Sequence, residues 1–542
     1  MSEQQIAEST ETKFEKLFSA IIFTLVIIVA FWFRFHQISI KPFHHDEGVN
    51  SYFLLNLASS GEYKYDPVNY HGPTLYYLAL IALRVFGEND LALRFWPALF
   101  GALTVAMLWS LRHHLGTIGT PVAAVCMALS PGLVYYSRDF IHEMLFGCFS
   151  LGIVVGAWRY AETKKFIWLV MLSYSVGLLF TTKETAIINT AVLIIAIICA
   201  AVWDITRKLM RQNRFSFAET VGELKSDLAS VLPSLDHSLA ALMIFVSIYI
   251  FLYSSLFSHW QGLTDFFKSI WLWASERSNK DHVHPFYYYI GIILKLELPL
   301  LIGSLLGGLF VLRRGNRFWL FIAAWTLGTA LAYSMIPYKT PWLIVSFLIP
   351  MAIITGYAAQ QIYRLSNLIS WKLIYAAVII TLTIFCWQIS WIVNFEKYDD
   401  NDNRTGYLRE LGERMKLKPY VDGQYGYVYA QTDRDTLELV RALKDETDKL
   451  GSGIRTGIYV ASPDYWPLPW YLRDYKQVTY SGGLTALPGQ RLSIAQPLVI
   501  ASATQRNIFD SRPGWRSIAG AFTLRPGVEL ILYVRDEEEN TK

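Results

Sequence analysis

The sequence predicts a polytopic α-helical membrane protein of about eleven transmembrane helices with a C-terminal α/β domain on the exoplasmic side. Three observations lead to this fold class. Hydrophobic residues make up 53% of the 542 residues, and the mean hydropathy is +0.30. The apolar residues fall in runs of about 20, the length that crosses a bilayer. Residues 394–542 contain no further run of that length.

The predicted spans form the N-terminal domain, residues 1–393, in which residues 37–92 form a long first exoplasmic loop. Alternate loops between the spans are rich in Lys and Arg, which marks the cytoplasmic side. This pattern places the N-terminus in the cytoplasm, the C-terminal domain outside, and the protein in the cell (plasma) membrane. The spans lie near residues 17–36, 93–111, 117–136, 145–161, 166–182, 185–203, 239–257, 288–312, 318–336, 341–360 and 371–393.

Residues 394–542 are predicted to form a soluble exoplasmic α/β domain. Runs of β-forming residues alternate there with a helical pattern over 436–450. The aromatic segment 465–471 either stacks on sugar or lies at the membrane interface, and the interface is the favoured interpretation. The β-type runs are 427–430, 458–461, 498–501 and 530–534.

The composition argues against nucleic-acid binding and against cysteine-based structures. The formal net charge is only +4, from 48 Lys and Arg against 44 Asp and Glu, so no nucleic-acid partner is predicted. The four cysteines all lie in apolar stretches, which predicts neither a disulfide framework nor a cysteine-rich metal site.

Ionisable residues of both signs fall on the predicted outer face. Charges near the hydrocarbon are costly unless they are paired or face water, so such residues are candidates for a functional site. The most informative are Asp46 and Glu47, just after the first span. We expect all of the candidate side chains to share one polar cavity that opens to the exoplasm. The other candidates are Arg138, Asp139, His142, Glu143, Lys183, Glu184, His282, His284, Lys295, Tyr338 and Lys339.

Carboxylates beside cations at a membrane surface suit glycosyl transfer from a polyprenyl-phosphate-linked sugar. A carboxylate such as Asp46 can accept the proton of an attacking hydroxyl. Cations can stabilise the charge that develops on the departing phosphate, and the candidates are Arg138, Lys183 and Lys339, with Lys295 as a secondary contact. Structural alternatives remain open, namely a helix N-cap for Asp46 and Glu47 and an ion pair for the charges of residues 138–143.

Several motifs resemble the GT-C superfamily, in particular the dolichyl-phosphate-mannose protein mannosyltransferases and the bacterial lipid A aminoarabinose transferases. The acidic pair is followed by Tyr65-Asp66-Pro67, by residues 71–77, by Phe86-Gly87-Glu88-Asn89 and by Arg94-Phe95-Trp96-Pro97. Residues 45–77, 182–185, 338–342 and 465–471 look most like the flippase activity-associated membrane proteins of glycosylation clusters. The resemblance covers nearly the whole chain.

The resemblance implies an enzyme, a hexosyltransferase with a polyprenyl-phosphate-sugar donor. It implies that Asp46 is the general base with Glu47 as its neighbour, that a second acidic position lies near Asp139 or Glu143, and that Arg138 faces the donor phosphate. A loop containing His282 and His284 would close over the donor or acceptor. The partners it implies are the lipid-linked sugar, membrane lipids and a protein or glycan acceptor.

Two questions stay open at the level of sequence. The same charges would also suit a lipid-linked sugar flippase, or a flippase-associated protein, without transfer chemistry. No metal site and no certain cofactor are predicted, although a divalent cation is left open because His282 and His284 alternate and can face the same way. The sequence does not identify the sugar, the polyprenol, the acceptor or the oligomeric state.

Overall fold

The chain divides into two units, which the computed structural model describes over residues 12–69, 71–212, 216–277, 282–365, 367–395, 426–484, 492, 494–510, 512 and 514–536. The helical unit comprises Met1–Ile38 and Asn56–Lys416, and the sheet unit comprises Ser39–Leu55 and Leu417–Lys542. The predicted boundary at residue 393 differs from this division, because residues 39–55 group with the C-terminal part of the chain.

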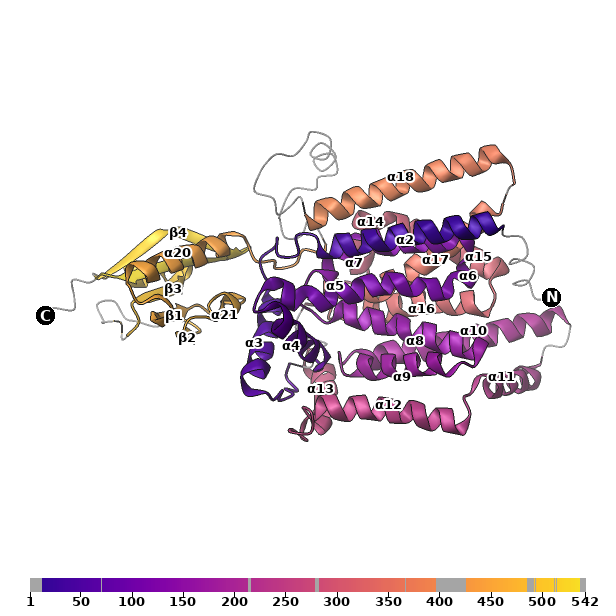
Figure 1. The fold of residues 1–542 in the computed structure, drawn as a ribbon, viewed down its shortest axis with the longest axis horizontal. Helices are drawn as coiled ribbons and strands as arrows, with labels where there is room; N and C mark the ends of the chain where they lie inside the picture. The colour runs from indigo at the N-terminus through magenta and orange to yellow at the C-terminus, as the bar shows by residue number, and fades with distance from the viewer. Residues whose placement is uncertain are drawn as a thin grey trace. The chain divides into compact units, whose positions relative to one another are not determined.

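Long apolar helices build the helical unit, and several of them lie alongside one another (Figure 1). Helix α3 (His45–Ser60) crosses the boundary between the two units. The helices of the helical unit are α2 (Lys13–Phe35), α4 (Thr74–Phe86), α5 (Asp90–Met107), α6 (Arg112–Leu129), α7 (Pro131–Ser137), α8 (Glu143–Thr163), α9 (Phe166–Phe180), α10 (Ala186–Arg211), α11 (Phe217–Val231), α12 (Leu235–Tyr253), α13 (Gly262–Leu272), α14 (Tyr288–Leu296), α15 (Leu298–Arg314), α16 (Arg317–Met335), α17 (Val345–Tyr363) and α18 (Ile369–Asn394). Short turns of 3₁₀ or π-helix, η1 (Leu108–Leu111), η2 (Trp273–Arg277) and η3 (Pro341–Ile344), lie between them.

These helices confirm the predicted membrane-spanning architecture. Within the described residues, 8 helices are long and apolar enough to cross a membrane, or 9 if the bent pair α14 and α15 counts as one span. Every predicted span lies on one or two of the helices, although α9 is a shorter apolar helix. The predicted continuous span over 288–312 is wrong in one respect, because α14 and α15 are bent by 108°. Pro299 explains the bend, since a proline clashes with the preceding helical turn and ends it.

Helices α5 and α6 run in opposite directions, although the chain between them stays helical. Arg94, near the start of α5, donates to the carbonyl of Ile38 just after α2, at 2.8 Å, and Trp109, after the end of α5, packs against Phe23 in the middle of α2 at a ring separation of 5.1 Å. The far end of α6 returns to the end of α2, where Arg34 donates to the carbonyls of Met127 and Ala128. The chain breaks at Gly116, whose φ of 77° favours glycine. The amide oxygen of Gln360 accepts the N–H groups of Ile118 and Gly119, at 2.9 and 3.0 Å, and so caps the helix that resumes there.

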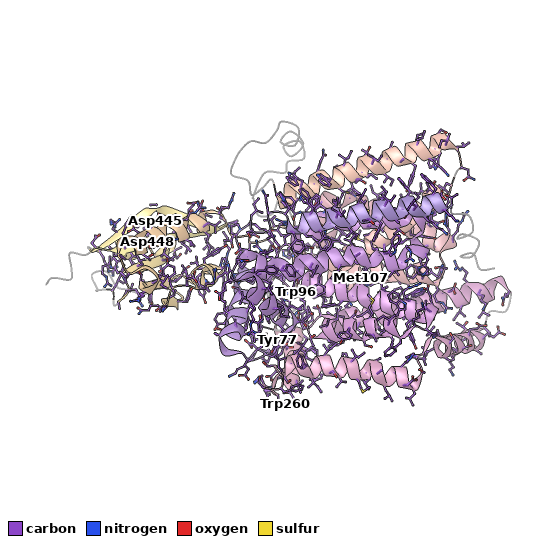
Figure 2. The ribbon with its side chains drawn as sticks, in the orientation of Figure 1. Tyr77, Trp96, Met107, Trp260, Asp445 and Asp448 are labelled. Carbon is purple, nitrogen blue, oxygen red and sulfur yellow. The ribbon has the colours of Figure 1, made fainter. Side chains whose placement is uncertain are left out.

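The sheet unit is a five-stranded mixed sheet with strand order β2-β1-β3-β5-β4. Strand β1 pairs in parallel with β2 and with β3, whereas β5 pairs antiparallel with β3 and with β4. Leu439 and Leu443 of helix α20 are buried in its core, while Asp445 and Asp448 lie exposed on the same helix (Figure 2). The elements are α20 (Asp435–Lys449), β1 (Gly457–Ala461), α21 (Leu468–Tyr471), β2 (Gln477–Ser481), β3 (Leu498–Ser502), α22 (Arg506–Asp510), β4 (Trp515–Arg525) and β5 (Val528–Arg535).

The predicted strands at 458–461, 498–501 and 530–534 and the predicted helix at 436–450 lie on elements of this unit. The strand predicted at 427–430 is wrong, because residue 427 lies in a turn, residue 430 in a bend, and the two residues between them form no regular structure. Contacts outside the sheet hold this segment. The carbonyl of Tyr429 contacts the imidazole of His44 at 2.8 Å, and the neighbouring Gln431 donates to the carbonyl of Pro42 at 3.0 Å.

Candidate functional site

The two adjacent carboxylates at the start of α3 have different surroundings. Glu47 is fully buried, and its Oε2 accepts the N–H of His44 at 2.9 Å. Asp46 is partly exposed, and its carboxylate accepts no hydrogen bond from any residue that the structure describes. The capping alternative therefore applies to Glu47, and Asp46 keeps its oxygens available to another molecule.

Two histidines hold this turn in place within the sheet unit. His44 Nδ1 accepts the N–H of Asp46 at 3.1 Å, so His44 Nε2 carries the proton that it donates to Tyr429. Arg525 donates to His45 Nδ1 at 3.2 Å and forms an ion pair with Asp464. Burial lowers the pKa of His45 to about 4, helped by His44 and Arg525 and opposed by Asp46. His45 is therefore neutral at neutral pH, beside the negative charge of Asp46.

The aromatic segment 465–471 anchors the chain just before Asp46. The ring of Phe43 stacks on Trp470 at a centroid distance of 5.1 Å, and the Phe43 N–H donates to the Tyr471 hydroxyl at 2.8 Å. Trp470 is only 1% exposed. Neither sugar stacking nor a membrane interface therefore fits Trp470, since its ring belongs to the core of the sheet unit.

A second cluster of charges lies in the helical unit, where helices α8 and α10 begin. Lys183 Nζ lies 2.6 Å from Glu143 Oε1, and both side chains are buried. The next residue, Glu184, lies 3.3 Å from His71 Nδ1. The His71 ring is 4.5 Å from the ring of His142. Predicted site residues from two separate loops, 142–143 and 183–184, thus come together, and His71 joins them although sequence analysis did not single it out.

Backbone hydrogen bonds bring His71 to this cluster. The N–H groups of Gly72 and Thr74 donate to the carbonyls of Thr182 and Thr181, at 3.0 and 3.1 Å. A Cβ on Gly72 would lie 2.1 Å from the Thr181 oxygen, so only glycine permits this approach. The motif His71-Gly72-Pro73 was the signal in the sequence, since a glycine between a histidine and a proline suggests a close backbone contact.

The electrostatics of the cluster favour its charged forms. Burial alone would lower the pKa of Lys183, but Glu143 and Glu184 outweigh it and raise that pKa. Burial would raise the pKa of Glu184, but the hydrogen bond and charge of His71 lower it. Burial, His71 and Lys183 hold the pKa of His142 well below its usual range. The cluster therefore combines paired ions with a neutral imidazole.

Arg138 lies away from these ion pairs and caps helix α2. Its guanidinium donates to the carbonyls of Phe33, Arg34, His36 and Gln37, at 3.0, 3.3, 2.6 and 2.7 Å. The side chain is fully buried, and the charge complements the negative end of the helix dipole. This geometry gives Arg138 a structural role, and its predicted contact with a donor phosphate stays a prediction. Asp139 is buried next to it.

The predicted loop residues near 282 and 339 pair with each other. Val283 forms an antiparallel bridge with Tyr338, and the N–H of Lys339 donates to the His282 carbonyl at 3.0 Å. Lys339 Nζ donates to the carbonyls of His284 and Ile336, at 3.0 and 2.6 Å, and burial lowers its pKa. The ring of His284 stacks on Tyr288. Residues 278–281 of this loop lie outside the described part of the chain.

The remaining predicted residue, Lys295, is exposed on α14 and makes no hydrogen bond or ion pair with a described residue. Its neighbour Glu297 is buried and accepts from the Ser130 hydroxyl at 2.7 Å and the Gly132 N–H at 3.0 Å. Glu297 thus stabilises the positive end of α7.

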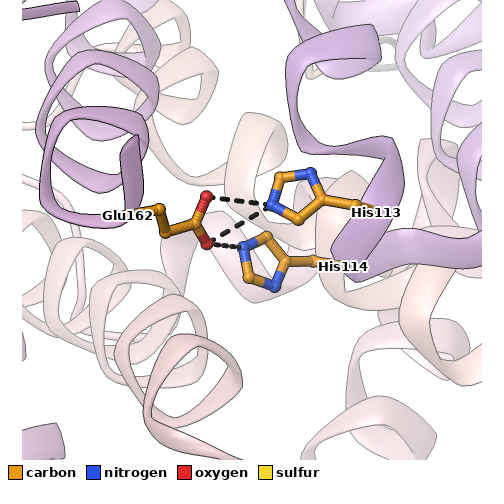
Figure 3. A group of neighbouring side chains, drawn as sticks. All are labelled: His113, His114 and Glu162. Carbon is orange, nitrogen blue, oxygen red and sulfur yellow. Dashed lines mark hydrogen bonds and ion pairs between the residues drawn. The ribbon is translucent and has the colours of Figure 1, made fainter. Parts of the chain in front are cut away.

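One group outside the predicted site has the composition of a metal site. The nearest ligand atoms of His113, His114 and Glu162 all lie within 4.8 Å of one another (Figure 3). Arg159 lies 2.9 Å from the Glu162 carboxylate and 3.2 Å from His113 Nε2. The arginine already balances the carboxylate, so the group is accounted for as a network of ion pairs. Sequence analysis did not single out these histidines.

Comparisons with known proteins agree with this architecture. Residues 70–222 match the family model "Dolichyl-phosphate-mannose-protein mannosyltransferase". ArnT from Cupriavidus metallidurans bound to undecaprenyl phosphate is 14% identical, with a TM-score of 0.59 over 95% of this chain and 97% of that chain. The apo form of ArnT is 12% identical, with a TM-score of 0.54, and the match again covers 95% of this chain and 97% of that chain.

A third solved structure, the apo oligosaccharyltransferase of Archaeoglobus fulgidus, is 14% identical with a TM-score of 0.52, covering 86% of this chain and 65% of that chain. No curated protein has a significant match. The solved structures confirm the predicted fold, and the family model agrees with the predicted resemblance to the dolichyl-phosphate-mannose protein mannosyltransferases. The closer resemblance to the flippase activity-associated proteins stays a prediction.

Proposed function

We propose that this protein transfers a sugar from a polyprenyl-phosphate carrier to an acceptor hydroxyl on the exoplasmic face, with Asp46 as the general base. The acceptor oxygen attacks the anomeric carbon, the bond from that carbon to the phosphate oxygen breaks, and the polyprenyl phosphate leaves. The proton of the acceptor hydroxyl passes to Asp46. The proposed product is a glycosylated protein or glycan.

The observation that carries this proposal is the uncommitted carboxylate of Asp46. Glu47 is buried and fixes the first turn of α3, so the turn does not depend on Asp46. His45 is neutral beside Asp46 and therefore does not neutralise it. A general base has to lie within reach of the hydroxyl that it deprotonates, and a partly exposed carboxylate on a fixed turn permits this.

The carrier class is supported by the similar structure of ArnT, which was solved bound to undecaprenyl phosphate. A membrane-spanning helical unit with that fold offers a long apolar surface to such a lipid. The proposed roles of Arg138, Lys183 and Lys339 at the donor phosphate are less favoured by geometry, because backbone carbonyls or Glu143 already accept hydrogen bonds from each of these side chains.

The test uses purified protein, membrane extract as the source of acceptor, and a panel of radiolabelled polyprenyl-phosphate hexoses. We expect wild-type protein to transfer label from at least one donor. Asp46→Asn should lower the rate by a factor of about 100 or more, because general bases contribute about 10²- to 10⁴-fold. Asp474→Asn is the matched control, since it removes an exposed carboxylate of the same unit.

Equal transfer rates for Asp46→Asn and wild type would overturn the assignment of the base. The flippase alternative would be favoured by two results together. The protein would transfer label from none of the donors, and it would move the labelled lipid across proteoliposome membranes equally well with and without Asp46. Thermal unfolding of both variants shows whether a loss of activity reflects misfolding.

A further inference from the structure

A basic cavity lies in the helical unit, away from the charge cluster of residues 71, 143, 183 and 184. Its volume is about 940 Å³, within the usual range for small-molecule sites of roughly 300–1,000 Å³. Ala186 and Arg207 lie near opposite ends of α10, about 30 Å apart along the helix axis at 1.5 Å per residue. The charge cluster adjoins the first end and the cavity adjoins the second.

The charges of the lining are strongly unbalanced. Asp204 is the only carboxylate among the lining residues, and it already pairs with Arg207 and Arg317, at 3.4 Å each. Cationic side chains reach the cavity from α2, α6, α10, α15 and the end of α17. They are Lys16, Arg112, Arg207, Arg313, Arg314 and Arg364.

Three of these cations are not committed to the protein. The side chains of Lys16, Arg313 and Arg314 make no hydrogen bond or ion pair with a residue that the structure describes. Like charges that converge in a recess repel one another and focus a positive potential, which raises the local concentration of anions. These three cations therefore lack a negative partner among the described side chains, and an anionic ligand would supply it.

The topological rule for basic loops does not by itself explain this arrangement. That rule requires Lys and Arg on the cytoplasmic side of a span, and cations spread over a surface would satisfy it. Here they converge on one recess from segments that are distant in sequence, beside the indoles of Trp109 and Trp319 and the hydroxyls of Thr117 and Thr120.

The type of anion follows from the donors. Guanidinium groups bind phosphate through two parallel hydrogen bonds, and Arg is enriched where that geometry is needed. A metal ion is disfavoured at this end of the unit, because the adjacent His113, His114 and Glu162 group already contains Arg159. Basic pockets between transmembrane helices are known to bind phosphate headgroups of lipids.

We propose that this cavity binds a phosphate-bearing anion, either the headgroup of an anionic phospholipid or a soluble phosphate compound. Asp46 is not among the residues that line this cavity, so the proposal does not depend on the proposed sugar transfer. Bound phosphate would bridge α2 and α15 through Lys16, Arg313 and Arg314, and would stabilise the folded helical unit by mass action.

The test measures binding to full-length purified protein with two kinds of probe. One arm compares nanodiscs of phosphatidylglycerol with nanodiscs of phosphatidylcholine, and measures lipid retention by native mass spectrometry. The other arm titrates inorganic pyrophosphate into protein in neutral detergent and measures the shift of the thermal unfolding midpoint. Either probe should raise the midpoint, and the effect should weaken at high salt because charges are screened.

The discriminating variant is the double substitution Arg313→Gln with Arg314→Gln. We expect it to weaken the binding of whichever probe binds the wild-type protein by at least tenfold. The matched control, Lys165→Gln with Lys225→Gln, removes two exposed charges that do not line the cavity and should bind like wild type. Retention of phosphatidylglycerol alone identifies a lipid site, and a response to pyrophosphate identifies a soluble ligand. Equal binding by the two double variants, or no binding of either probe by wild type, would overturn the proposal.

Discussion

At the scale of single residues, adjacent charges in this protein have separate functions. Glu47 is buried and caps a helix, whereas Asp46 is partly exposed and accepts no hydrogen bond from the described residues. Likewise, Arg138 caps α2, while Glu143, five positions later, forms a buried ion pair. Sequence position alone does not separate these roles, because each depends on which distant backbone or side chain lies opposite.

The buried ion pair of Glu143 and Lys183 gives a stability prediction. Glu143→Gln or Lys183→Met alone should each destabilise the protein by about 3–5 kcal/mol, because each leaves one buried charge without its partner. The double variant should lose much less than the sum, and thermal unfolding in detergent measures the difference. The control cycle uses the exposed pair Lys208 and Glu223, whose coupling should be about 0–1 kcal/mol. Additive losses at Glu143 and Lys183 would contradict the pairing.

His45 gives a prediction of pH dependence. Its pKa falls from 6.5 to about 4 in the folded protein, so the unfolded chain binds a proton more readily between these values. The stability from neutral His45 is therefore present above pH 6.5 and is lost as the pH falls toward 4. We expect the unfolding midpoint of His45→Gln to fall less than that of wild type over this interval. His282→Gln, which removes an exposed imidazole, should behave like wild type.

At the scale of helices, polar side chains satisfy helix ends that would otherwise lie in apolar surroundings. Arg34 donates to the carbonyls of Met127 and Ala128, at 3.2 Å each, near the end of α6. Arg138 does the same for α2. Gln360 accepts N–H groups where α6 resumes after its break at Gly116, and Glu297 accepts one at the start of α7. In a membrane, backbone groups have no water to bond with, so these contacts matter more than on a surface.

Arg138 provides a test of this view. Arg138→Gln should lower the thermal unfolding midpoint, because several buried carbonyls at the end of α2 would lose their donor at about 1–3 kcal/mol each. Arg138→Lys should rescue only part of the loss, since an ammonium cannot reproduce the planar fork. Arg84→Gln, which removes an exposed arginine of α4, is the control. A midpoint unchanged by Arg138→Gln would remove the capping role.

At the scale of the whole molecule, the sequence predicted the membrane architecture well because apolar run length depends on local composition. All predicted spans lie on helices. The bend before Pro299 was missed, although proline was a local signal. The strand predicted at 427–430 was wrong because Tyr429 and Gln431 bond with residues 42–44, and no local pattern reports such a distant partner.

The candidate site was predicted in part for the same reason. Charge type and position identified His142, Glu143, Lys183 and Glu184, which the fold brings together. His71 reaches them through a backbone contact that only Gly72 permits. The grouping of residues 39–55 with the sheet unit follows from the packing of Phe43 on Trp470, an aromatic pair more than 400 positions apart in the sequence.

The helix-capping arginines have a practical implication for protein engineering. Charged residues inside membrane spans are costly, so hydropathy alone would suggest exchanging them for leucine. At Arg34 such an exchange would raise the hydropathy of α2, but it would also remove the hydrogen-bond donor of the carbonyls of Met127 and Ala128 at the end of α6. Libraries for this protein are better restricted to lipid-facing positions such as Leu17, Ile21 and Leu25, where no backbone group depends on the side chain.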